Sequence, residues 1–176
     1  DANQQGRSAS GVRGIKLADD GKLVGAIAIP MVQVSEDESD EERHSRTTED
    51  ATLSLLTVTE HGYGKRTLVD EFRVQPETGP MRSQSRGGKG RADIKTTKRN
   101  GPSVAACMVA DTDDVVVISR KGQLVRMAAS DISQIGRGTQ GVRIVGLNDG
   151  DAVVAVARVA DSGDSEPEEA TEAQAE

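Results

Sequence analysis

An internal repeat constrains the fold of this chain more than any other feature of its sequence. A glycine/arginine block stands at residues 136–144 (GRGTQGVRI), at 6–15 (GRSASGVRGI) and, in altered form, at 84–90 (QSRGGKG). One full unit reads as strand, turn, basic strand, glycine/arginine loop, strand, glycine turn and apolar strand. Such a unit holds about four strands in roughly 45–60 residues, which is the size of a propeller-type blade.

The strands of these units are predicted from short runs rich in β-branched residues, separated by Gly, Asn and Asp. The sequence shows no sustained helical period, and residues 128–134 are long enough for a single turn only. With one Tyr, one Phe and no Trp, the core must be built from Val, Ile, Leu and Ala. We therefore expect an all-β chain with strands at 23–29, 52–59, 104–109, 114–119, 123–127, 142–147 and 152–159.

Charge and repeat boundaries together divide the chain into five parts. Residues 1–30 form the second half of a blade, 51–112 a whole blade, and 113–160 the last blade. Residues 31–50 read as an acidic loop or linker with two basic and eight acidic side chains, and 161–176 as a disordered tail with seven acidic side chains. Because two and a half blades cannot close a ring, we expect the chain to be the C-terminal piece of a longer protein.

The signals for an enzyme or a metal centre are weak. The G-x-G-x-x-G string at 136–141 precedes a predicted strand, whereas a dinucleotide site needs a helix there. His44 and His61 have no second ligand at metal-binding spacing. Cys107, the single cysteine, reads as a small buried apolar residue, and Tyr63 as an ordinary strand residue. We predict no catalytic residue, no bound metal and, from the short apolar runs, no membrane contact.

The glycine/arginine loops carry the strongest functional signal. Glycine lets the backbone adopt positive φ and approach phosphates closely, beside Arg and Lys side chains. Because a repeat places such loops on corresponding corners of successive blades, their charges should form a stripe that suits a bent DNA duplex. The alternative is that the glycines serve tight turns between blades and the charges solvate an edge. The candidate DNA contacts are Gln84, Arg86, Gly87, Gly88, Lys89, Gly90, Arg91, Lys95, Lys98, Arg99, Arg7, Arg13, Lys65, Arg66, Lys121, Arg126, Arg137 and Arg143.

Several ordered blocks of the sequence resemble the C-terminal domain of the DNA gyrase A subunit. QSRGGKG at 84–90 is similar to the gyrase-A box, Q-[RK]-R-G-G-[RK]-G, with Ser85 in place of the basic residue at its second position. Five further blocks resemble the sequences of the family's blades. They are HGYGKRT at 61–67, IKTTKRNG at 94–101, LVR at 124–126, GRGTQGVR at 136–143 and GRSASGVRGIKL at 6–17. The A subunit of topoisomerase IV has similar but more degraded boxes and is the alternative.

This resemblance implies a β-pinwheel, a propeller-like ring of four-stranded antiparallel blades with exchanged strands. It also implies non-sequence-specific binding and wrapping of double-stranded DNA, in support of ATP-dependent negative supercoiling by a type IIA DNA topoisomerase. The implied partners are the gyrase B subunit and a second A subunit, and the implied location is the cytoplasm, in association with the nucleoid. ATP and Mg²⁺ would belong to the partner subunit and the holoenzyme, and the DNA-cleaving tyrosine to a domain upstream. A protein-binding propeller whose basic rim meets acidic partners is the second alternative.

Overall fold

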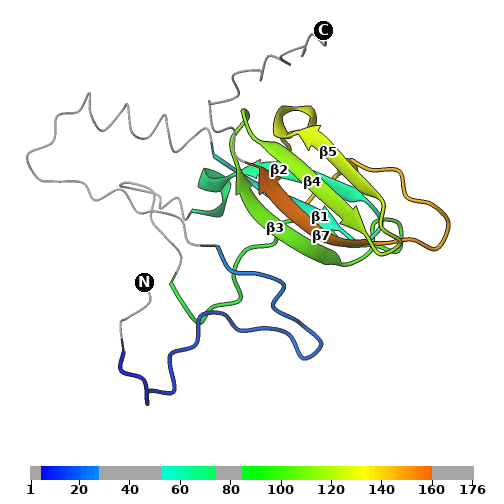
Figure 1. Ribbon diagram of the computed structural model, residues 1–176. Helices are drawn as coiled ribbons and strands as arrows, with labels where there is room; N and C mark the ends of the chain where they lie inside the picture. Colours follow the sequence, from blue (N-terminus) through cyan, green and yellow to red (C-terminus); the bar gives the residue numbers. More distant parts are fainter. Residues whose placement is uncertain (1–4, 28–52, 74–84, 160–176) are drawn as a thin grey trace, which may run out of the picture.

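The computed structural model describes residues 5–27, 53–73 and 85–159, and the strands among them form two antiparallel sheets (Figure 1). The first sheet has the order β3 (Ser103–Val109), β1 (Ser54–Thr59), β2 (Tyr63–Leu68) and β6 (Val142–Arg143). The second has the order β5 (Leu124–Ala128), β4 (Asp114–Ser119) and β7 (Val153–Val159). Short 3-10 turns follow β2 (η1, Val69–Phe72) and β5 (η2, Ala129–Asp131). The described residues contain no α-helix, which confirms the all-β prediction.

The two repeat units exchange a strand. β6 belongs to residues 113–160, yet it pairs with β2 of the preceding unit, with Tyr63 opposite Arg143 and Gly64 opposite Val142. This exchange completes the first sheet with four strands and leaves the second with three. The sheets therefore do not coincide with the repeat units, and the loop that leads into β6 is held against the neighbouring unit.

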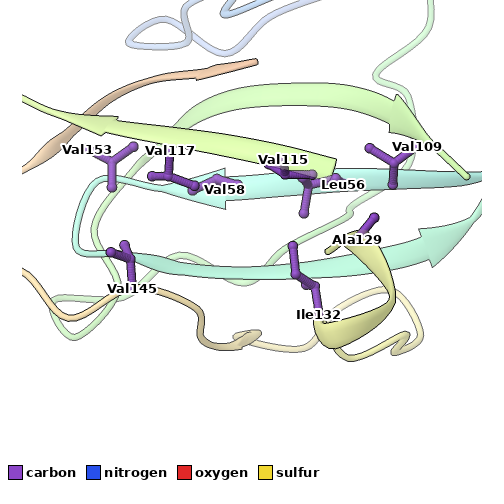
Figure 2. Close-up of a cluster of buried hydrophobic side chains, with 9 residues drawn as sticks. All are labelled: Leu56, Val58, Val109, Val115, Val117, Ala129, Ile132, Val145 and Val153. Atoms are coloured by element: carbon purple, nitrogen blue, oxygen red, sulfur yellow. The ribbon is translucent and has the colours of Figure 1, made fainter. Parts of the chain in front are cut away.

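The hydrophobic core lies between the two sheets. Leu56 and Val58 of β1 alternate along the strand and point toward Val115 and Val117 of β4, which do the same (Figure 2). The remaining members of the cluster are Val109, Ala129, Ile132, Val145 and Val153. Burying a side chain of this size contributes about 1.5–3 kcal/mol, so these residues fix the face-to-face stacking of the blades. The prediction of an aliphatic core is confirmed.

Two expected strands differ from the structure. The strand expected over 142–147 is limited to β6, because the chain then turns and the amide N–H groups of Ile144 and Val145 both donate to the carbonyl of Gly62. Residues 23–27 form no strand, although Leu23 and Val24 are apolar and exposed. A strand requires a hydrogen-bonded neighbour, and none of the described strands lies alongside this segment.

Some predictions fall outside the described residues. These are the acidic linker at 31–50, the acidic tail at 161–176 and the candidate contact Gln84. Within the described ranges, no helix has the length and apolar character needed to cross a membrane.

Candidate nucleic-acid interface

Two loop segments from successive units, residues 91–99 and 133–143, lie side by side along the outer edge of β2. The amide of Gly138 donates to the carbonyl of Asp93 at 2.5 Å, and the amide of Lys95 donates to that of Thr139 at 2.7 Å. The second segment is in turn tied to β2, because the amide of Arg66 donates to the carbonyl of Ser133 at 3.0 Å. Together the segments bring six cations onto one edge, and we call this set the basic band: Arg91, Lys95, Lys98, Arg99, Arg137 and Arg143.

The box-like loop at 85–91 adds a second basic layer. The amide of Gly87 donates to the carbonyl of Gly14 at 2.7 Å, and the amide of Lys16 donates to that of Gly88 at 2.8 Å. Gly87 and Gly90 both have positive φ, 76° and 73°, as the sequence predicts for glycines in such a loop. Arg86 and Lys89, which are both exposed, thus lie on a loop whose backbone pairs with the segment that follows the exposed Arg13. Arg7 is also exposed, in a separate turn.

The sequence predicts Lys65 and Arg66 on the surface, but the structure places both in the interior. Lys65 is 0% exposed and its Nζ lies 3.1 Å from Oδ1 of Asp93. Arg66 is 6% exposed, donates from Nε to the carbonyl of Ile132 at 2.7 Å and pairs with Asp111. Both cationic side chains are paired with carboxylates of the protein itself, so neither is available to DNA in this conformation.

The buried Lys65 instead holds the basic band in place. Its Nζ donates to the carbonyl of Gly136 at 2.9 Å and to that of Asp93 at 3.2 Å, so it contacts both band segments. The hydroxyl of Thr57 donates to Oδ2 of Asp93 at 2.5 Å. Such a buried polar network resists rearrangement, because breaking any one of its hydrogen bonds leaves a buried group unpaired.

Asn100 makes a second buried connection between the same segments. Its side-chain amide nitrogen donates to the carbonyls of Lys95 and Gln140, both at 3.0 Å, and its Oδ1 accepts from the amide of Thr97 at 2.7 Å. The residue is 0% exposed. Asn100 and Asp93 escape prediction from the sequence because both resemble ordinary turn residues. The available signal was the recurrence of an Asn-Gly or Asp-Gly turn after each glycine/arginine loop.

Two other candidate contacts lie elsewhere. Arg126 is on β5 and donates from Nε to Oδ2 of Asp114 at 2.7 Å. Lys121 is in the turn between β4 and β5 and donates to the carbonyl of Asp149 at 2.6 Å. The structure therefore gathers part of the expected stripe into the basic band and its second layer, and it leaves these two cations with local partners.

The electrostatic surroundings differ between the two ends of the band. At one end, Oε2 of Glu71 lies 4.0 Å from Nε of Arg137 and accepts from the amide of the same residue at 3.1 Å. At the other end, Nε of Arg99 donates to the hydroxyl of Tyr63 at 3.1 Å. Hydrogen bonds from Arg99 and then from Arg143 lower the pKa of the Tyr63 phenol, because they stabilise its ionised form.

The described residues hold no group of three or more His, Cys, Asp or Glu side chains that could bind a metal. The glycine string at 136–141 leads into strand β6 and not into a helix, as predicted. Cys107 packs against the core, and burial raises the pKa of its thiol. The geometry thus offers a charged binding surface.

Antiparallel blades that stack face to face, exchange a strand and carry basic loops on one outer edge define a propeller-like domain of the β-pinwheel class. The family model described as "DNA gyrase C-terminal domain, beta-propeller" matches residues 2–30, 53–79 and 113–160. The chain belongs to this family, as the sequence blocks predicted.

The relatives agree with this assignment. The chain is 42% identical over 156 residues to the DNA gyrase A subunit of Haloquadratum walsbyi, and 40% identical over 161 residues to that of Salmonella typhimurium. These alignments cover 89% and 92% of the chain, which spans 15% of the length of each relative. A solved structure titled "Structure of DNA gyrase A C-terminal domain" matches with a TM-score of 0.51 and 27% identity, over 60% of this chain and 33% of that one.

Proposed function

We propose that the chain binds double-stranded DNA without sequence preference and wraps it as part of a DNA gyrase A subunit. The observation that carries this proposal is the basic band, in which segments 91–99 and 137–143 of successive units place six cations on one outer edge. The relatives, which are A subunits of DNA gyrase, support the same assignment. Wrapping by this surface would support ATP-dependent negative supercoiling by the type IIA topoisomerase.

An array of cations is what DNA wrapping needs energetically. Bending a 20–30 base-pair site by 40–90° costs roughly 1–6 kcal/mol, which one or two phosphate contacts do not offset. The band and the box-like loop supply contacts from two successive units, and further blades would extend the same edge. Because these contacts go to phosphates, they fix the path of the duplex and carry no base sequence information.

The finer parts of the proposal rest on the relatives. The B subunit of gyrase and a second A subunit would be the partners, in a cytoplasmic enzyme associated with the nucleoid, and ATP and Mg²⁺ would act in the holoenzyme. A topoisomerase IV A subunit is the alternative of the same class. A propeller that binds acidic proteins is the alternative of a different class, and it predicts no retention on duplex DNA at moderate salt.

The salt dependence of DNA affinity tests the proposal. Log K should fall linearly with log salt concentration, with a slope of about −0.9 per phosphate neutralised. The double variant Lys95→Gln/Lys98→Gln removes two exposed band cations, so its slope should be shallower by about 1.8, for all DNA sequences alike. Fluorescence anisotropy of labelled duplexes of unrelated sequence would measure both quantities.

The matched control is Lys22→Gln/Arg120→Gln, which removes the same net charge from exposed positions outside the band. Its slope should stay close to that of the unmodified chain. Equal slopes for the two double variants would show that the band does not contact phosphate. Failure of the unmodified chain to bind any duplex would contradict the function itself.

A further inference from the structure

Tyr63 lies at the point where the two repeat units exchange a strand, and two arginines from different units flank it. Cζ of Arg99 is 5.1 Å from the centroid of the phenol ring, and Cζ of Arg143 is 5.6 Å from it. Arg99 belongs to the unit at 51–112, whereas Arg143 is on the exchanged strand β6 and pairs with Tyr63 across the sheet. Tyr63 is only 5% exposed, but both arginines are exposed.

These two arginines are held differently from most others in the structure. Arg66, Arg73, Arg120, Arg126, Arg137 and Arg158 each lie within ion-pair distance of a carboxylate. Arg99 and Arg143 instead converge on a neutral hydroxyl and an aromatic face, and no carboxylate of the described residues forms an ion pair with either. Both guanidinium groups place positive charge beside one phenol, with no ion-paired carboxylate among the described residues to balance it, and an anion that contacts both arginines would supply that balance.

We propose that Arg99 and Arg143, which come from neighbouring units and both contact Tyr63, form a discrete binding site for one backbone phosphate of DNA. The inference rests on the proposed function for the source of the phosphate. A phosphate bound there contacts both units at once, so it bridges neighbouring blades at the exchanged strand. Each guanidinium presents a planar fork of N–H donors, which suits the oxygens of a phosphate.

The backbone around the site is fixed before any ligand binds. Nδ1 of His61 donates to the carbonyl of Arg99 at 3.1 Å, and the amide of His61 donates to the carbonyl of the buried Asn100 at 3.1 Å. Stacking of each guanidinium group on the tyrosine ring restrains the two arginine side chains further. Such preorganisation lowers the entropy lost on binding, so this site should contribute more affinity than a free lysine of the band.

The composition of the chain supplies a direct probe, because Tyr63 is its only tyrosine and it has no tryptophan. In the free protein the two arginines lower the pKa of the phenol. A phosphate bound to both guanidinium groups offsets their positive charge and adds negative charge near the phenol, and both effects raise the pKa of Tyr63. The ionisation of Tyr63 can be followed by the ultraviolet absorbance of tyrosinate as the pH of the 176-residue chain is raised. The midpoint of this titration should shift to higher pH when saturating duplex DNA is added.

Variants test the same site independently. Arg99→Gln and Arg143→Gln should each weaken duplex binding about three- to tenfold at low salt, and the double variant should lose less than the product of the two factors because the residues share one phosphate. The Arg120→Gln variant, which removes one exposed arginine outside the site, should change affinity less than twofold. Inorganic polyphosphate, tested in the same tyrosinate titration, distinguishes binding of any phosphate from binding that needs a duplex.

The outcomes separate this site from the function. If the unmodified chain binds DNA while its tyrosinate titration is unmoved and Arg99→Gln and Arg143→Gln bind normally, the site is refuted and the function stands. If the chain binds no DNA, the function is refuted. A shift with polyphosphate alone would leave a phosphate site but contradict its assignment to DNA. The titration of the unmodified chain gives its answer even where a variant fails to fold.

Discussion

Replacing Lys65 with methionine is expected to lower the free energy of unfolding by about 3 kcal/mol. Removing one partner of a buried ion pair costs about 3–5 kcal/mol, since the other charge stays buried without a counterion. The side chain of Asp93 retains 19% exposure, so water offsets part of that penalty and the lower end of the range applies. Urea denaturation followed by circular dichroism would measure the change.

A second substitution separates the ion pair from simple packing. In the Lys65→Met background, Asp93→Asn should cost much less than it does alone, because the uncompensated carboxylate is already destabilising there. Lys98→Met provides the matched control, since Lys98 is exposed and its substitution should change stability by no more than about 0.5 kcal/mol. Strictly additive costs for Lys65→Met and Asp93→Asn would contradict an energetic pairing between the two side chains.

The blade architecture was predictable because the predicted strands recur in the same order in each repeat unit. Short runs rich in β-branched residues at 52–59 and 114–119 indicate strands, and the structure places β1 and β4 there. The aliphatic core followed from the near absence of aromatic residues. The length of β6 was not predictable, because it depends on how the chain turns at Gly62, some eighty residues earlier in the sequence.

The cation positions were predictable only in part. The loops of the repeat indicated the basic band, but the strand residues Lys65 and Arg66 were misplaced. Their counterions, Asp93 and Asp111, lie 28 and 45 residues further along the chain, so no local pattern reveals them. A weak signal existed nonetheless: Lys65 lies between Tyr63 and Thr67 at a spacing of two, and all three therefore share one face of the strand.

Gly141→Ala is expected to destabilise the protein by about 3 kcal/mol and to displace the basic band from β2. Gly141 has a φ of 73°, which costs an L-residue roughly 1–2 kcal/mol. A β-carbon there would also lie 2.7 Å from the carbonyl oxygen of Gly64, in the backbone of β2, and relieving such a contact costs about 1–3 kcal/mol. The backbone of the loop must therefore move away from β2, which weakens the pairing of β6.

Gly138→Ala is the matched control, because it lies in the same loop and has nearly the same φ, 75°, but its β-carbon would meet nothing within 4 Å. This substitution should lower the free energy of unfolding only by the cost of a positive φ for an L-residue, about 1–2 kcal/mol. The difference between the two variants in urea denaturation thus isolates the close approach of the loop to β2. In duplex binding at a temperature where both remain folded, Gly141→Ala should be the weaker binder, because Arg137 and Arg143 flank the displaced segment. Equal stability of the two variants would mean that the band is not held against β2 by this contact, and that its position depends on the Lys65 and Asn100 networks alone.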